Sequence, residues 1–236
     1  MDHVLVLDSV KRQFNGRPAL NGLSLSLRSG EVFALLGPNG AGKTTALNLI
    51  LGFMIADAGK IHVCGEDVSA DPAKSRRNIA YLPEQVAIYP ELSGVENLRY
   101  FTLLASLDLH EADLRPLLKN AGLADEAHDR LARTYSKGMR QKVGLAIAMA
   151  RRARLLLMDE PTSGLDPSAA AELSNAIRAA ANQGVAVLMT THDLYRIKEV
   201  ADRVGVLNAG SITGEVDPRF MDHVALEQFY VKQFVQ

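Results

Sequence analysis

Residues 37–44 have the composition of a phosphate-binding turn. The segment consists of Gly37, Pro38, Asn39, Gly40, Ala41, Gly42, Lys43 and Thr44, and Thr45 follows it. Backbone N–H groups of such a turn point at one place, and the positive end of a following helix favours an anion there. The Lys43 ammonium can reach the β- and γ-phosphates of a nucleotide, and the Thr44 hydroxyl can bind Mg²⁺. These residues predict a nucleoside triphosphate site.

Three further polar residues follow apolar runs typical of buried strands. Asp159 and Glu160 come after residues 155–158, and His192 comes soon after residues 185–189. Open α/β sheets bind ligands at the carboxyl ends of their strands. Asp159 can hold Mg²⁺, Glu160 can orient or deprotonate an attacking water, and a neutral His192 can bind the γ-phosphate. The alternative is that these polar residues only form turns, but a neighbouring phosphate-binding turn favours catalysis.

Hydrophobic patterns predict the elements that position these residues. Strand-like runs occupy residues 4–7, 23–27, 31–36, 61–64, 79–82, 155–158, 185–189 and 204–207. Helical patterns follow Thr44, span residues 168–182 and 223–236, and begin again at Leu194, while residues 93–154 are helical almost throughout. Alternating strands and helices imply a parallel sheet covered by helices. We therefore predict an α/β nucleotide-binding core with a helical insertion.

Composition excludes several other classes of protein. The chain has 236 residues, 47% of them hydrophobic and 22% charged, with a formal net charge of -1. This balance gives no general attraction to nucleic acid or anionic lipid, although Arg151, Arg152 and Arg154 form either a local basic patch or a solvated helix end. The single Cys64 excludes an internal disulfide, and the six histidines have no metal-cluster spacing. We expect neither a secretion signal at the first residues nor a membrane-spanning segment, so that any membrane role requires docking.

A second glycine-containing turn lies between the two nucleotide motifs. It contains Tyr135, Ser136, Lys137, Gly138 and Met139 and opens a helical pattern. With this turn included, the whole chain resembles the ATP-binding subunit of an ABC transporter. The resemblance rests on residues 37–44 and 155–160, on a signature segment at 135–141, on Ser163, Gly164, Leu165 and Asp166 as a dimer-contact loop, and on His192 as a switch histidine.

The resemblance implies a fold, a division of the chain and a mechanism. The fold is a P-loop NTPase (RecA-like) core with an antiparallel β subdomain and an α-helical insertion subdomain. Residues 1–92 and 155–222 form the ATP-binding core, 93–154 the signature subdomain and 223–236 a short terminal helix. The cofactors are ATP and Mg²⁺. Two ATPase subunits form a homodimer or a heterodimer, in which each ATP lies between one phosphate-binding loop and the partner's signature.

Several residue roles are also implied by the resemblance. Phe14 stacks on adenine, residues 135–139 contact the ATP of the partner subunit, and Lys43, Glu160 and His192 serve hydrolysis. Mg²⁺ is held by Thr44, Asp159 and either Glu84 or Gln85. The commonest family signature reads Leu-Ser-Gly-Gly-Gln, so Tyr135, Lys137 and Met139 are departures. Lys137 leaves the backbone geometry open, because residues other than glycine tolerate positive φ poorly.

The resemblance also implies partners and a location. The expected partners are integral-membrane permease subunits, with the ATPase bound peripherally at the cytoplasmic face of the inner membrane. Residues 85–100 resemble the segment that receives the permease, where Val86, Ile88, Tyr89, Pro90 and Leu92 form either a contact patch or local core. Three motifs, at residues 81–84, 89–94 and 135–141, are similar to the branch that serves ABC-2-type permeases, and in particular to the ATPase of nitrous oxide reductase maturation. The alternatives are an ATPase for drug or ion efflux, or a non-transport ATPase that acts on nucleic acid or ribosomes. Family members that act on nucleic acid or ribosomes usually have two cassettes in one chain or a very long coiled-coil insertion. This sequence has one cassette and no sustained heptad repeat, so we expect no nucleic acid partner.

Overall fold

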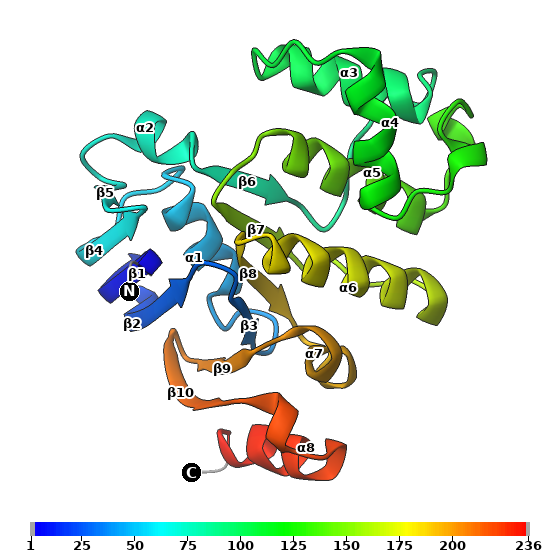
Figure 1. Ribbon diagram of the computed structural model, residues 1–236. Coiled ribbons are helices and arrows are strands. Elements are labelled where there is room, and N and C mark those ends of the chain that lie inside the picture. The colour runs from blue at the N-terminus through cyan, green and yellow to red at the C-terminus, as the bar shows by residue number, and fades with distance from the viewer. Residues whose placement is uncertain (1–2, 235–236) are drawn as a thin grey trace.

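The computed structural model describes residues 3–234 and contains a six-stranded sheet and a four-stranded sheet (Figure 1). The larger sheet has the order β10-β9-β3-β8-β7-β6. Its strands are β3 (Val32–Leu36), β6 (Ile79–Leu82), β7 (Leu155–Asp159), β8 (Ala186–Thr191), β9 (Arg203–Asn208) and β10 (Ser211–Val216). All neighbouring pairs are parallel except β9 and β10, which are antiparallel. β3 is buried along its whole length, as its apolar sequence predicts.

The smaller sheet is antiparallel, with the order β2-β1-β4-β5. Its strands are β1 (His3–Phe14), β2 (Arg17–Arg28), β4 (Ala58–Val63) and β5 (Glu66–Asp67). Leu23, Leu25 and Leu27 alternate with polar residues and are buried, because successive side chains of a strand point to opposite faces. They join a core cluster with α1 (Lys43–Ile50) and with one face of the larger sheet.

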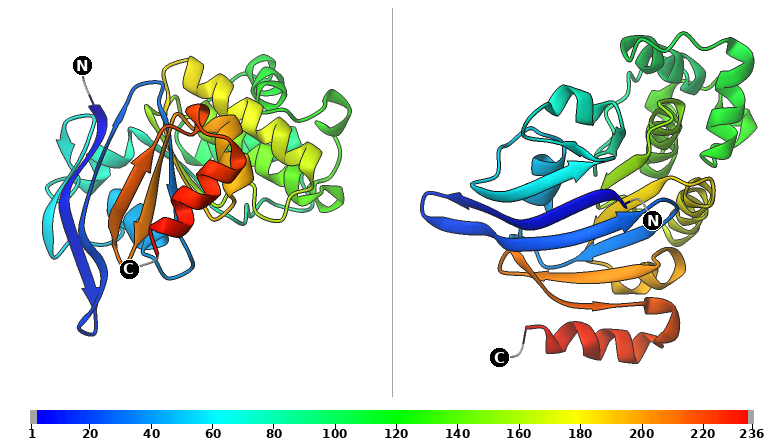
Figure 2. Two further views of the ribbon diagram at one scale, coloured as in Figure 1. Left: turned by 90° about the horizontal axis from the view of Figure 1, so that it is seen from below. Right: turned by 60° about the vertical axis from the view of Figure 1, so that its left-hand side comes forward.

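The remaining helices cover the larger sheet or extend beyond it. Near the sheet lie α2 (Pro72–Arg76), α6 (Pro167–Asn182), α7 (Leu194–Val200) and α8 (His223–Lys232). A helical lobe contains α3 (Gly94–Leu104), α4 (Glu111–Asn120), α5 (Lys137–Ala150) and short 3₁₀ turns at Asp125–Ala127 and Ala132–Thr134; a third such turn, Pro218–Phe220, precedes α8. Figure 2 shows this lobe on the side of the molecule opposite the β1–β2 hairpin. Within residues 3–234, no helix combines the length and the apolar character that crossing a bilayer requires.

The arrangement confirms the predicted α/β class, with an antiparallel sheet and helices between residues 93 and 154. Among the strands and α-helices, three were not predicted: β5, β10 and the short α2. β10 escapes a pattern search because Gly214 interrupts it, yet a Cβ at this position would lie 2.6 Å from Gln233 Oε1, so the glycine lets α8 approach the strand. The last predicted helix is shorter than expected and ends at Lys232. The first two residues, and positions 235–236 of that predicted helix, lie outside the described residues.

Candidate active site

The phosphate-binding turn connects β3 to α1 and lies under the β1–β2 hairpin. Gly42 precedes α1 with a φ of 110°, a backbone conformation that favours glycine. A Cβ on Gly42 would lie 2.4 Å from the Ala19 carbonyl oxygen in β2. The hairpin therefore packs directly against the turn, and any side chain at residue 42 would separate them.

Lys43 points back into this turn. Its side chain is only 7% exposed, and its ammonium donates to the Gly37 carbonyl oxygen at 2.6 Å. The same ammonium lies 3.3 Å from Glu160 Oε1. A shallow cavity of about 210 Å³ opens here, lined by Pro38, Asn39, Gly40, Lys43, Thr44, Thr45, Glu84, Asp159 and Glu160. The structure thus gathers residues from three separate segments of the sequence around one polar hollow.

Thr44 and Asp159 face each other across the cavity. Thr44 Oγ1 lies 3.5 Å from Asp159 Oδ2, and the Thr190 hydroxyl donates to Asp159 Oδ1 at 2.6 Å. A hydroxyl and a carboxylate are hard oxygen ligands that suit Mg²⁺, which usually keeps water and substrate phosphate as its other ligands. Among residues 3–234, no group of three or more His, Cys, Asp or Glu is arranged to hold a metal ion by itself. The donor set therefore fits a Mg²⁺ ion that arrives with a nucleotide.

The position of Glu160 is fixed by its backbone conformation and by side-chain contacts with Lys43 and His192. Its φ of 47° is left-handed, which costs a residue other than glycine of order 1 kcal/mol or more. Its N–H donates to the carbonyl and hydroxyl oxygens of Thr190, at 3.2 and 3.1 Å. Its carboxylate lies between the Lys43 ammonium and His192 Nδ1, which is 2.8 Å from Oε2. The strained backbone thus directs this carboxylate into the cavity.

Thr190 is a positioning residue that sequence reasoning missed. It is fully buried at the end of β8, and its hydroxyl both donates to Asp159 and accepts from the Glu160 N–H. The available signal was a pair of threonines after an apolar run, next to His192. Only the fold shows which acidic residues that hydroxyl meets.

We expect Thr190→Val to lower the rate of ATP hydrolysis by about 10- to 100-fold, the range for losing a partner that orients a metal ligand. Valine keeps the volume but removes both hydrogen bonds. Steady-state hydrolysis at several Mg²⁺ concentrations measures the effect, and Thr190→Ser, which keeps the hydroxyl, is the matched control. A wild-type rate and metal dependence in the valine variant would show that the hydroxyl is dispensable.

Tyr81 in β6 adds an electrostatic detail. Its side chain is partly exposed, and burial of the rest, followed by the nearby Asp159 carboxylate, raises its pKa above the usual value. Like an ordinary tyrosine, Tyr81 is protonated at neutral pH and adds no negative charge beside the acidic pair.

The signature turn lies at the start of α5 in the helical lobe. Ser136 caps the helix, because its hydroxyl accepts the Met139 N–H at 3.2 Å. Lys137 is the first helical residue and is not among the residues with positive φ, so the expected backbone difficulty does not arise. Gly138 allows close packing, since a Cβ there would lie 2.9 Å from Ala169 Cβ in α6. Tyr135 turns inward and donates to the Ala127 carbonyl oxygen at 2.6 Å, so its side chain packs within its own chain.

The structure brings some predicted site residues together and keeps others apart. The residues 135–139 do not line the phosphate cavity of their own chain. Glu84 lines that cavity and Gln85 does not. Phe14 ends β1, is 41% exposed, and carries the Arg12 guanidinium 5.0 Å from its ring centre. Asp166 caps α6 by accepting the Ala169 N–H, which ends the loop that begins at Ser163.

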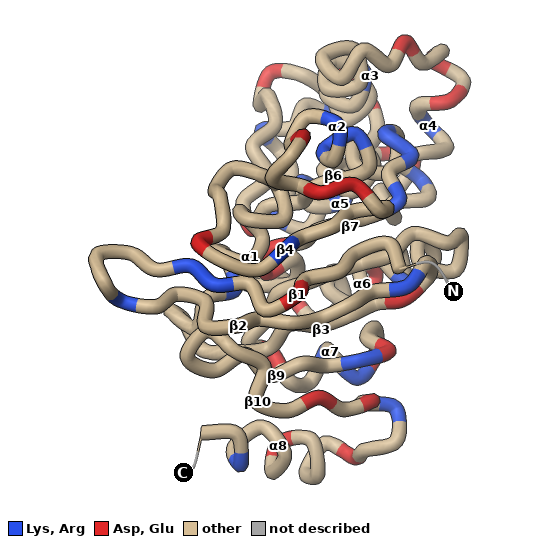
Figure 3. The backbone as a smooth tube through the Cα atoms, turned by 90° about the vertical axis from the view of Figure 1, so that its left-hand side faces the viewer, with Lys and Arg blue, Asp and Glu red and all other residues tan. Residues whose placement is uncertain are grey.

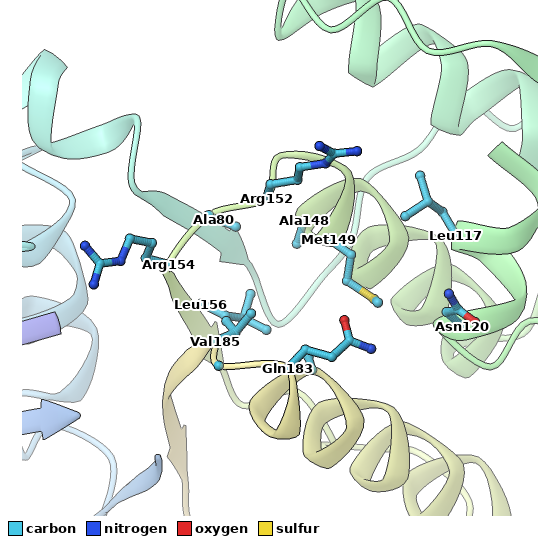
Figure 4. Close-up of a pocket in the computed structure, with 13 residues that line it drawn as sticks. Ala80, Leu117, Asn120, Ala148, Met149, Arg152, Arg154, Leu156, Gln183 and Val185 are labelled. Carbon is cyan, nitrogen blue, oxygen red and sulfur yellow. The ribbon is translucent and has the colours of Figure 1, made fainter. Parts of the chain in front are cut away.

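A second cavity, of about 400 Å³, lies between the ends of α5 and α6 and has mainly apolar walls (Figure 4). Asn120, Met149 and Gln183 surround it, whereas the guanidinium groups of Arg152 and Arg154 point away from its centre. Its lining contains no carboxylate and no phosphate-binding turn. The chemistry therefore assigns the active site to the smaller polar cavity.

Comparisons with known proteins agree with this geometry. The family model described as "ABC transporter" matches residues 20–163. The daunorubicin resistance ATP-binding protein DrrA3 of Streptomyces coeruleorubidus is 37% identical over 216 residues, covering 91% of this chain and 68% of that protein. The lipopolysaccharide export system ATP-binding protein LptB of Haemophilus influenzae is 32% identical over 244 residues, and the match covers 98% of this chain and 98% of that protein.

A solved ATP-binding subunit of an ABC transporter superposes with a TM-score of 0.83 at 28% identity, covering 98% of this chain and all of that one. This likeness confirms the predicted P-loop NTPase fold. The matched segment contains the phosphate-binding turn, the signature turn and the acidic pair. The chain therefore belongs to the ABC transporter family, as one of its ATP-binding subunits that hydrolyse ATP.

Proposed function

We propose that this chain drives export by a separately encoded membrane permease. The main structural support for ATP hydrolysis is the Glu160 carboxylate, which lies between Lys43 and His192 beside the phosphate-binding turn. A carboxylate in this position favours hydrolysis over mere nucleotide binding. Relatives named for daunorubicin resistance and lipopolysaccharide export support the export class.

In the proposed reaction, backbone N–H groups of residues 37–44 and the Lys43 ammonium bind the phosphates of ATP. Thr44, Asp159 and Glu84 would hold Mg²⁺, which neutralises charge on the phosphate oxygens when bound. Glu160 accepts a proton from water as the water oxygen attacks the γ-phosphorus, and ADP leaves with the electrons of the broken P–O bond. His192 keeps Glu160 in place and binds the γ-phosphate, while Phe14 stacks on the adenine.

The proposed site is completed by a second subunit. Ser136 and Gly138 lie at the N-terminal end of α5, where N–H groups attract an anion, but they are outside their own chain's phosphate cavity. A partner's ATP is the ligand that the family resemblance implies for them. The proposed dimer also uses the loop at residues 163–166, and is a homodimer unless a second ATPase replaces one copy.

Mixing two inactive variants tests the shared site. Lys43→Ala disables the phosphate-binding turn and Ser136→Ala the signature, yet a mixed dimer retains one intact site. Because random pairing makes half of the dimers mixed and each mixed dimer has one intact site, we expect more activity than either parent shows, up to about a quarter of the wild-type hydrolysis rate. Each variant alone is the control, and a mixture no more active than its parents would contradict the shared site.

A surface formed by α3 and the segment that precedes it is the proposed permease contact. Tyr89 stacks edge-on against Tyr100 with ring centres 4.8 Å apart, and both rings are partly exposed. Leu104, at the end of the same helix as Tyr100, is 64% exposed. Val86 and Ile88, by contrast, pack partly against the core. The aromatic residues therefore supply the exposed part of the predicted segment, and the aliphatic residues anchor it.

The proposal places the ATPase at the cytoplasmic face of the membrane. Residues 1–92 and 155–222 form its core, residues 93–154 form the helical signature subdomain, and the segment from residue 223 is an appended helix. Pairing with ABC-2-type permeases, and a role in nitrous oxide reductase maturation, stay predictions from three short motifs.

Affinity purification from the native membrane tests the proposal. We expect a multi-spanning membrane protein to co-purify, and its identity would define the cargo class. Lys and Arg positions alternate with Asp and Glu positions along the backbone in Figure 3. Binding of polynucleotide with steep salt dependence, and no membrane subunit, would favour the nucleic-acid alternative instead.

A further inference from the structure

Lys137 contacts two loops that lead to the phosphate cavity of its own chain. Its ammonium donates to the Ser163 carbonyl oxygen at 2.6 Å and lies 3.9 Å from Glu84 Oε1. The side chain passes over Gly164, where a Cβ would lie 3.4 Å from the ammonium nitrogen. The lysine thus joins the start of α5 to the segment after β6 and to the segment after β7.

Helix stability does not explain this lysine. A cation in the first turn opposes the helix dipole, and the first turn of α5 contains no acidic residue to balance it. Compensation comes instead from outside the helix, through the Ser163 carbonyl and the Glu84 carboxylate. The contact is therefore tertiary, and it ties the position of α5 to those two loops.

Both loops are connected to the phosphate cavity of the same chain. Glu84 lines the phosphate cavity, and its backbone carbonyl also accepts a hydrogen bond from Gln141 of α5, at 2.7 Å. The Ser163 N–H donates to the carbonyl oxygen of Glu160 at 3.1 Å. A nucleotide that displaces Glu84 or Glu160 would therefore also displace the groups that Lys137 contacts, which are the Glu84 carboxylate and the Ser163 carbonyl.

We propose that Lys137 is a positioning residue that couples occupancy of one phosphate cavity to the placement of the same chain's signature turn. This inference rests on the proposed shared site, because that signature turn serves the partner's ATP. Binding at one site then aligns α5 for the other, and the two sites of a dimer respond cooperatively to ATP.

The dependence of hydrolysis rate on ATP concentration tests the coupling. We expect a wild-type Hill coefficient clearly above one, with about two as its upper limit for two sites. Lys137→Met, which keeps an unbranched apolar stem but loses the ammonium, should lower the coefficient to about one. Lys137→Arg should keep it, since the guanidinium can still donate to Ser163 and face Glu84.

Lys119→Met is the matched control, since this lysine of the same lobe is exposed and its ammonium pairs with Asp125 at 3.2 Å, away from both loops. A purely structural role of Lys137 would lower the melting temperature or the rate but leave the Hill coefficient unchanged. A wild-type coefficient of one, or a wild-type coefficient in folded Lys137→Met, would overturn the proposal. Failure of the shared site would appear separately, as a Lys43→Ala and Ser136→Ala mixture that is no more active than either parent, whereas absence of coupling alone would leave that mixture with about a quarter of the wild-type rate.

Discussion

Glu160→Gln is expected to keep ATP binding while losing hydrolysis by about 10²- to 10⁴-fold, the usual contribution of a general base. Glutamine has nearly the same shape but cannot take a proton from the attacking water. Its amide can still meet His192, which lies 2.8 Å from the Glu160 carboxylate. Binding of a labelled ATP and single-turnover phosphate release would measure the two properties separately.

Glu199→Gln provides the control for this prediction, because Glu199 is an exposed carboxylate of α7. Its removal should leave both binding and hydrolysis at wild-type levels. Unchanged turnover in Glu160→Gln would remove Glu160 from the catalytic role. Loss of ATP binding in that variant would instead show that the carboxylate is needed to shape the cavity.

Lys43→Ala is expected to weaken ATP binding itself. Within the part of the chain that the structure describes, Lys43 is the one lysine or arginine that lines the phosphate cavity, beside three acidic residues. Truncating one partner of a buried charge pair costs about 2–5 kcal/mol, which corresponds to about 30- to 4,000-fold in Kd. Titration calorimetry with ATP and Mg²⁺ would measure this loss.

The structure supplies a control for folding in this experiment. Lys43 also holds the Gly37 carbonyl and neighbours Glu160, so its removal could disturb the turn itself. Lys43→Met keeps the buried apolar stem, and its thermal unfolding measures whether the protein still folds without the ammonium. Wild-type affinity in a folded Lys43→Met protein would refute the role of Lys43 in binding phosphate.

Local sequence was sufficient for the parts of the site that lie on one segment. The turn at residues 37–44 and the pair Asp159 and Glu160 follow apolar strands, and the parallel sheet brings them to the same edge. The strand at Ile79–Leu82 was predicted with its observed ends. In each case the pattern and the chemistry lie within a few adjacent residues.

Contacts between distant segments could not be predicted in this way. The Thr190 hydroxyl bridges Asp159 and Glu160, and the Lys137 ammonium reaches Ser163, through pairings that no local pattern encodes. The same limit applies to Glu84 and Gln85, since the sequence left both as possible metal contacts. Only the path of the chain after β6 shows that Glu84 lines the cavity.

The position of β3 has a consequence for synthesis of the protein. β3 carries the phosphate-binding turn, but its two neighbours in the sheet are β8 and β9, which occur far later in the chain. Such non-local pairing forms late, since a long loop must close before its contacts stabilise it. A chain still being translated therefore contains the complete nucleotide motif without a sheet to support it. We expect ATP affinity to appear only after residue 208 has emerged, so that nucleotide binding marks a finished fold.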